Sequence, residues 1–171
     1  ARFDRDGDLG AQLAPLAPDL VVDASGPFQA YGANPYRVVE ACIARGISYL
    51  DLADGSDFVA GIAAFDAAAR ARRVFVLSGV SSFPVLTAAV MRVLGRKMSA
   101  IETVTAGIAP SPYAGMGRNV IRAIASYAGK PVRLRRDGAD ARGYTLTETM
   151  RFTVAPPGGL PLENRRFALV D

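Results

Sequence analysis

The sequence contains no histidine and only one cysteine, Cys42. Histidine is the commonest general base and the commonest metal ligand, so its absence excludes a Ser-His-Asp or Cys-His hydrolytic site, and a histidine zinc site, within this chain. We therefore predict that the chain holds no metal. A single cysteine cannot form an internal disulfide and is typical of a reducing compartment, so we predict a cytoplasmic protein.

Long apolar runs and phosphate-binding loops are missing as well. No run approaches the roughly 20 apolar residues that span a bilayer, and we predict no contact with a membrane. Neither the G-x-G-x-x-G motif nor the G-x-x-x-x-G-K-[ST] motif occurs. These 171 residues therefore do not encode phosphate binding by a glycine-rich loop at a helix start.

The positive charge is unevenly distributed. The formal net charge is +4 at pH 7; residues 1–97 carry ten basic and ten acidic side chains, and residues 98–171 carry ten basic and six acidic. The densest basic cluster is Arg133, Arg135 and Arg136. No aromatic residues are interleaved with these arginines, as they are in nucleic-acid-binding surfaces. We therefore predict no nucleic-acid partner and interpret the cluster as a solvated strand edge.

The first half of the chain alternates strand and helix patterns, and half of all residues are hydrophobic, as in a packed globular protein. The runs DLVVDAS at 19–25, ISYLDLA at 47–53 and RVFVLSG at 73–79 predict strands, and each precedes a segment with helical spacing. This alternation favours an α/β fold with a parallel sheet. Gly46 is expected to end the first helix. The stripes expected to face the core are Val38, Val39, Cys42 and Ile43, then Phe58, Ile62, Phe65 and Ala69, then Val85, Ala88, Ala89, Val93 and Leu94.

The pattern changes near residue 97. We predict a partial parallel domain at 1–97 and a smaller α+β domain, mostly antiparallel, at 98–171. The elements predicted in the second domain are a strand over 98–108, a helix over 119–127 with Val120, Ile121, Ile124 and Ala125 facing inward, and strands over 131–137, 144–154 and 165–170.

All three strands of the first domain are predicted to end in small or polar residues. The first runs into Ser25-Gly26-Pro27, the second ends at Asp51 with Asp54 shortly after it, and the third ends in the serine- and glycine-rich stretch 78–82. Ligands of open parallel sheets lie beyond the carboxyl ends of the strands. Glycine lets a ligand approach the backbone, and serine or aspartate can hydrogen-bond ribose or amide groups. The sequence therefore predicts a ligand at this edge.

The same residues also have purely structural interpretations. Glycine and serine after a strand are ordinary turn and N-cap residues, and Asp54 or Ser56 alternatively caps the helix that follows. Cys42 lies on a buried stripe and is interpreted as a packing residue. A turn that is merely tight stays open as an explanation of Ser25-Gly26-Pro27.

Three segments resemble the saccharopine dehydrogenase-like family: DLVVDASGPFQAYG, VVEACIARGISYLDLADGSDFV and SGVSSFPVLTAAV. In that family a strand ends in Gly-Pro-Phe, a helix carries Ala-Cys, a Tyr-x-Asp strand follows, and Ser-Gly-x-Ser-Ser-x-Pro opens the next helix. The resemblance covers about residues 19–95. The later stretch GIAPSPYAGMGRNVIRAIASYAGKPV is similar to the second domain of one branch of the family.

The resemblance implies a partial Rossmann-like domain that binds NADP or NAD across the strand ends. It also implies that a glycine-rich βαβ unit with the pyrophosphate loop precedes Ala1, so we expect the chain to be a piece of a longer protein. The second domain is then expected to supply a substrate wall and a homodimer interface. The implied cofactor-binding residues are Ser25, Gly26, Pro27, Phe28, Asp51, Ser78, Gly79 and Ser81; Tyr31 and Arg118 are the substrate-binding candidates, and Asp54 is the catalytic candidate.

The function that follows from the resemblance is hydride transfer at an imine or carbonyl centre of a small-molecule substrate. We expect the 171-residue chain by itself to be inactive. Two alternatives remain open: a non-catalytic module that binds a dinucleotide or metabolite, and a dimerisation domain. An upstream glycine-rich loop favours the oxidoreductase over both.

Overall fold

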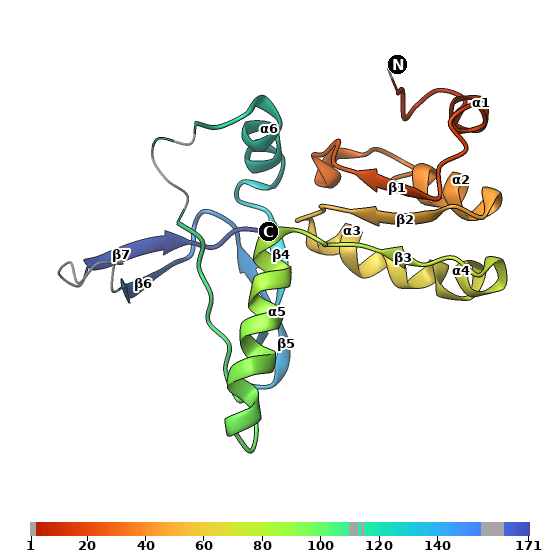
Figure 1. Cartoon of the computed structure of the whole chain (residues 1–171). Coiled ribbons are helices and arrows are strands. Elements are labelled where there is room, and N and C mark those ends of the chain that lie inside the picture. Colours follow the sequence, from red (N-terminus) through yellow and green to blue (C-terminus); the bar gives the residue numbers. More distant parts are fainter. Residues whose placement is uncertain (1–2, 110–112, 114, 155–162) are drawn as a thin grey trace. The chain divides into compact units, whose positions relative to one another are not determined.

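A computed structural model describes residues 3–109, 113, 115–154 and 163–171 of the chain (Figure 1). The chain divides into two compact units, Ala1–Val104 and Thr105–Asp171, whereas the sequence pattern placed the boundary near residue 97. Among the described residues, none of the helices is long and apolar enough to cross a bilayer.

The first unit is built on a parallel sheet of three short strands. They are β1 (Leu20–Asp23), β2 (Ser48–Asp51) and β3 (Val76–Leu77), in the spatial order β1-β2-β3. Both strand pairs are parallel. The structure thus confirms the mixed helix-and-strand fold with a parallel sheet that the alternating pattern predicts.

Helices precede the first strand, connect the three strands and follow the last one. The helices of the first unit are α1 (Leu9–Leu13), the 3-10 turn η1 (Phe28–Ala30), α2 (Arg37–Arg45), α3 (Ser56–Gly61), η2 (Ile62–Phe65), α4 (Asp66–Arg72), α5 (Ser82–Leu94) and η3 (Gly95–Lys97).

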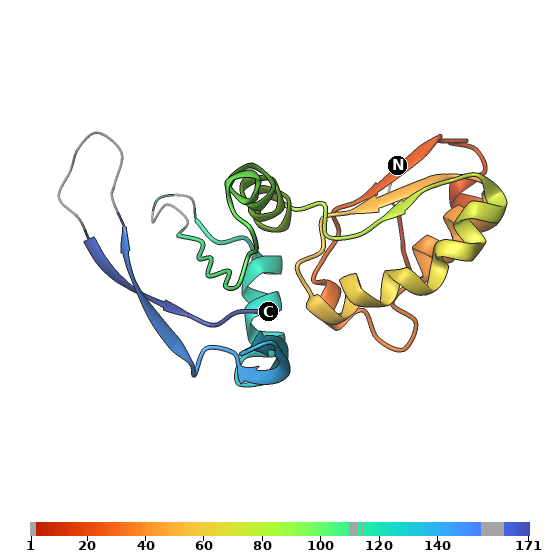
Figure 2. The same cartoon turned by 90° about the horizontal axis from the view of Figure 1, so that it is seen from below.

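The core lies on one face of the sheet, beneath α2 and α4 (Figure 2). The whole predicted α2 stripe is buried, and Cys42 is a packing residue with no exposed surface. The second predicted stripe is confirmed too: Phe58 and Ala69 are buried, with Ile62 and Phe65 partly buried against the core clusters. Residues spaced about four apart bury one side of a helix because each turn contains 3.6 residues.

Gly46 ends α2 in the left-handed conformation, with φ +71°. Its N–H is bonded to the carbonyl of Ile43, and the N–H of Ile47 is bonded to that of Cys42. These bonds satisfy carbonyls at the end of the helix, so the predicted C-cap is confirmed.

The third predicted stripe is wrong. The structure describes all of α5, and none of its side chains is buried. The spacing of Val85, Val93 and Leu94 predicted a helix correctly, but spacing cannot say whether a partner surface covers that helix.

The second unit contains one helix and two hairpins among its described residues. Helix α6 (Arg118–Tyr127) precedes a hairpin of β4 (Pro131–Arg136) and β5 (Ala139–Tyr144), and a second hairpin pairs β6 (Thr149–Val154) with β7 (Glu163–Ala168). Asp137 and Gly138 turn the first hairpin with φ +52° and +76°. Positive φ at both positions matches the twist of paired strands, and Asp-Gly is a preferred pair there.

Three predictions for this half of the chain are wrong. No strand forms over 98–108. The predicted strand over 144–154 is broken, because the chain turns at Thr145–Glu148, where Leu146 has φ +59° and the Glu148 carboxylate accepts a bond from the N–H of Tyr144. In α6 the buried side chains are Ala123 and Tyr127, whereas Val120, Ile121 and Ala125 are exposed.

Replacing Gly46 tests the C-cap of α2. A Cβ at this position meets no described atom within 4 Å, so the cost of Gly46→Ala is backbone strain alone. We expect Gly46→Ala to lower the free energy of unfolding by about 1 kcal/mol and Gly46→Asn to lower it by less, because asparagine enters the left-handed region more readily. Urea denaturation measures both. Equal stability of Gly46→Ala and the unsubstituted chain would contradict the assignment.

Candidate functional site

Asp51 joins the carboxyl ends of β2 and β3. Its Oδ1 accepts bonds from the N–H of Ala53 (3.0 Å), the hydroxyl of Ser78 (2.9 Å) and the N–H of Gly79 (2.9 Å). Its backbone carbonyl also accepts the N–H of Val80. Asp51 is completely buried, and its second oxygen, Oδ2, has no hydrogen-bond partner among the described residues. One carboxylate therefore fixes the loop that follows β3.

A second buried carboxylate, Asp23, stands beside Asp51 at the end of β1, since the two residues are register partners. Its Oδ1 accepts both the N–H (2.9 Å) and the hydroxyl (2.6 Å) of Ser25. The Ser25 hydroxyl lies 2.8 Å from the Tyr31 hydroxyl. Because Ser25 donates its proton to Asp23, its oxygen accepts the proton of Tyr31. The chain of bonds runs from Tyr31 through Ser25 to Asp23.

Tyr49 lies between these groups and the core. It is completely buried, and its hydroxyl donates to Oδ2 of Asp23 over 3.4 Å. Burial, followed by the negative charge of Asp23, raises the pKa of Tyr49 well above its usual value. Burial also raises the pKa of Tyr31 to about 12. Both phenols are therefore protonated at neutral pH.

An aromatic cluster supports the turn after β1. The ring of buried Phe28 lies 4.9 Å from that of Tyr31 and 5.0 Å from that of Phe58, and Tyr36 stacks on Phe58 at 4.8 Å. The guanidinium of Arg5 lies over the Tyr31 ring, 3.1 Å from its centroid. Edge and stacking contacts of this kind stabilise ring pairs by about 0.5–1.5 kcal/mol each, so Tyr31 is supported by Phe28 on one side and by the Arg5 guanidinium over its ring.

Gly26 and Gly79 differ in whether the structure itself excludes a larger residue at their positions. Gly79 has φ +71°, and a Cβ there would lie 3.3 Å from the Val59 side chain, so its own backbone and packing demand glycine. Gly26 has neither constraint: the nearest described atoms to its Cβ would be the Phe28 ring at 3.7 Å, an ordinary contact. The bond between Gly26 and Pro27 is cis.

Asp54, the catalytic candidate, is exposed and accepts a bond from the amide of Gln29 over 3.0 Å. The N-cap position of α3 is Gly55, which lies between Asp54 and Ser56 and makes no side-chain cap bond. The predicted capping residues therefore flank the N-cap position rather than occupy it. Ser81 occupies the N-cap position of α5, where its carbonyl accepts the N–H of Val85.

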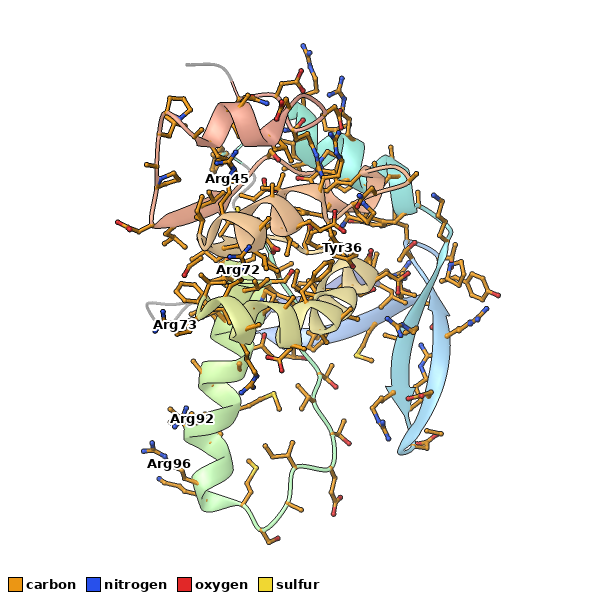
Figure 3. All side chains as sticks on the ribbon, turned by 90° about the vertical axis from the view of Figure 1, so that its right-hand side faces the viewer. Tyr36, Arg45, Arg72, Arg73, Arg92 and Arg96 are labelled. Carbon is orange, nitrogen blue, oxygen red and sulfur yellow. The ribbon has the colours of Figure 1, made fainter. Side chains whose placement is uncertain are left out.

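In the first unit, the arginines of α2 and α4 that Figure 3 labels lie away from this edge. Arg118 begins α6 in the second unit. Figure 3 shows Arg45, Arg72 and Arg73 at the C-terminal ends of α2 and α4, away from Tyr36. Among the described residues, Arg5 is the cation that contacts the aromatic cluster.

Arg135 and Arg136 lie on β4. Arg136 pairs with Glu148, and this hydrogen bond lowers the pKa of the glutamate. Arg135 donates to the carbonyl of Gly138 and lies 3.5 Å from Asp140. Both arginines thus have partners within their own unit.

The structure brings together Ser25, Asp51, Ser78, Gly79 and Tyr31 of the predicted set. Sequence reasoning missed three residues: Asp23, Tyr49 and Arg5. Asp23 carried a signal, since it is an acidic residue at the last position of an apolar strand and therefore in register with Asp51. Arg5 carried none, because a long-range ring contact leaves no local pattern.

Neither the scan against protein-family models nor the search of curated proteins found a match for this chain. Groups of three or more His, Cys, Asp or Glu side chains able to hold a metal ion do not occur among the described residues.

Removing the Asp51 carboxylate tests its role as the joint between β2 and β3. Asp51→Ala leaves the Ser78 hydroxyl and two buried N–H groups without their acceptor, and each such loss costs about 1–3 kcal/mol. We expect Asp51→Ala to unfold the first unit or to lower its stability by at least 3 kcal/mol. Ser78→Ala, which removes one donor, is expected to cost about 1 kcal/mol. Calorimetry of both variants checks the order, and a cost for Ser78→Ala that equals that of Asp51→Ala would contradict it.

Alkaline pH tests the buried phenols. Tyr31 and Tyr49 keep their protons in the folded state at pH values where an unfolded tyrosine, with its pKa near 10, has lost its own. The folded state then binds more protons, so stability is complete below pH 10 and falls as pH rises toward 12 and beyond. We expect Tyr49→Phe to unfold less steeply with pH over this range. If Tyr49→Phe and the unsubstituted chain showed the same pH dependence of the free energy of unfolding, the burial of this hydroxyl would be contradicted.

Proposed function

We propose that the carboxyl edge of the three-stranded sheet forms part of a nicotinamide dinucleotide site, in an oxidoreductase related to the saccharopine dehydrogenase-like family. The observation that carries this proposal is Gly26. A side chain at this position would be neither crowded nor, by its backbone conformation, strained. Glycine after β1 is then explained by a molecule that lies against its backbone, as the sequence motif Gly-Pro-Phe of that family implies.

The polarity of the edge supports the same ligand. Ser25 follows β1, and Ser78 and Gly79 follow β3, so they lie at the carboxyl ends of the two strands that flank β2, where ligands of such sheets bind. The protons of the Ser25 and Ser78 hydroxyls are donated to Asp23 and Asp51, so their oxygens are left to accept hydrogen bonds from ribose hydroxyl or carboxamide N–H groups. The buried Asp51 holds Ser78 and Gly79 in place before any ligand binds, so this loop loses less conformational entropy on binding.

Tyr31 is suited to donate a proton to a reacting group rather than to accept one from it. With its pKa near 12 it is protonated at neutral pH, and its hydroxyl is continuous with Ser25 and Asp23. A proton that Tyr31 gives to an imine nitrogen or carbonyl oxygen during hydride transfer would be replaced from solvent, because Tyr31 is only partly buried, and the Ser25 hydroxyl would hydrogen-bond the phenolate until then. Asp54 remains the second candidate, exposed at the same edge and bonded to Gln29.

The variant Gly26→Ala distinguishes the two explanations of this glycine, a ligand lying against its backbone or a turn that is merely tight. The test is a fluorescence titration with NADPH and NADH, run on the protein extended upstream to include the βαβ unit that the resemblance implies, with the 171-residue chain as the weaker-binding control. We expect Gly26→Ala to weaken binding of the reduced cofactor at least tenfold while the thermal midpoint stays within about 2 °C, because the new methyl group meets only the Phe28 ring.

Gly79→Ala is the matched control, since it is expected to lower stability as well as binding. No binding by the extended protein would refute the dinucleotide proposal. Binding without turnover of any amino acid and keto acid pair would assign the protein to the non-catalytic alternative instead.

A further inference from the structure

The hairpin of β6 and β7 in the second unit places two arginines directly opposite each other (Figure 1). Arg151 of β6 and Arg166 of β7 are register partners, so their side chains leave the same face of the hairpin, with Cβ atoms roughly 5 Å apart. Both side chains are exposed. Like charges at directly opposed positions destabilise a pair of strands, so this pair costs stability unless an anion neutralises it.

The other face of this hairpin is the one that packs. Side chains alternate between faces along a strand, which separates the two arginines from Phe152 and Phe167. These two rings meet edge to face with their centroids 5.1 Å apart, and both residues are half-buried. A Cβ on Gly107 would lie 3.1 Å from the Phe167 ring, so the chain before α6 approaches this same face. The arginine face is therefore the one turned toward solvent.

No described acidic side chain compensates the two arginines of this face. Neither Arg151 nor Arg166 has a hydrogen bond or an ion pair with another described residue. Glu148, which directly precedes β6, is bonded to Arg136 and to the N–H of Tyr144. The described neighbours of the pair, two residues along on the same face, carry no charge: Thr149, Thr153 and Ala168. The face thus offers two positive charges and two hydroxyls without a described negative charge.

The hairpin of β4 and β5 carries a comparable pair but also an acid. Arg133 is the register partner of Arg142, and both are exposed. Asp140 lies two residues from Arg142 on the same face, diagonal to Arg133 and within reach of a long side chain. Arg135, opposite Asp140, lies 3.5 Å from its carboxylate. An acid therefore lies among the arginines of this face, whereas none is described on the face of Arg151 and Arg166.

We propose that the face formed by Arg151 and Arg166 binds the phosphate group of a small phosphate monoester. Each guanidinium presents a planar fork of N–H donors that matches two oxygens of a phosphate. A dianion neutralises both arginines, whereas a carboxylate or a phosphate diester, with one negative charge, neutralises only one. Thr149 and Thr153 flank Arg151 on the same face and add hydroxyl donors. This site belongs to the second unit and does not rest on the dinucleotide proposal.

Amide NMR of the labelled 171-residue chain, titrated with phenyl phosphate at constant ionic strength, tests the site. We expect millimolar phenyl phosphate to shift the amides of Arg151 and Arg166 saturably, and sodium chloride at equal ionic strength to leave them unshifted. Arg166→Gln is expected to weaken binding at least tenfold, because it removes a charge-assisted bidentate contact. Arg135→Gln is the matched control: it removes the same charge from the other hairpin and is expected to leave binding unchanged. The same spectra show whether each variant is folded.

The pH dependence of binding reports the charge of the ligand. The second pKa of a phosphate monoester lies near 6, so its dianion is lost on acidification and we expect the affinity to fall about tenfold between pH 7.5 and pH 5. Sulfate keeps both charges over this range and is expected to bind equally at both pH values, because the chain contains no histidine. Dimethyl phosphate, a diester with one charge, is expected to bind at least tenfold more weakly than phenyl phosphate.

Four results would overturn the proposal. They are equal binding of the monoester and the diester, an unchanged affinity of folded Arg166→Gln, shifts that sodium chloride reproduces, and tighter binding of a single-stranded oligonucleotide that shifts the amides of both hairpins. The last result would assign these arginines to a nucleic-acid backbone. Binding of nicotinamide dinucleotides at the sheet edge is measured separately, so failure of either proposal leaves the other standing.

Discussion

The Asp51 carboxylate determines the arrangement of the first unit. A single oxygen accepts three donors from two segments, and bonds to a charged acceptor are worth about 1.5–3 kcal/mol each. They fix Ser78 and Gly79 beside the end of β2, and with them the direction in which α5 leaves the sheet. Asp23 has a similar role at the end of β1, where it accepts the hydroxyl of Ser25, which in turn is hydrogen-bonded to Tyr31. The polar edge is thus preorganised by two buried acids.

Much of the first unit could be predicted from the sequence, because its helices and strands bury regular patterns. The α2 stripe, the Gly46 cap and the parallel order follow from spacing and from the short loops. The exposure of α5 could not be predicted, since its apolar spacing is the same whether or not a surface covers it. In the second unit the turn at Thr145–Glu148 includes a hydrogen bond from the N–H of Tyr144 to the Glu148 carboxylate. The alternating sequence pattern of residues 144–154 gives no sign of this bond.

The candidate site was predicted in part for a related reason. Serine, glycine and aspartate after a strand are visible in the sequence, and Ser25, Ser78 and Gly79 do lie at the predicted edge. Which carboxylate they bind depends on register, and the stacking of Arg5 on Tyr31 depends on chain segments that are not neighbours in sequence. The loop after β3 presents Ser78 and Gly79 at the polar edge, where the Asp51 carboxylate holds them.

The central claim is that a reduced dinucleotide contacts the carboxyl edge of this sheet. Amide NMR of the labelled chain with millimolar NADPH tests it most directly, because weak binding still shifts the signals of the residues touched. The account predicts shifts at Ser25, Gly26, Ser78 and Gly79, with the amides around Arg45 and Arg73 unchanged. Shifts confined to the arginine clusters, or none at all, would contradict it.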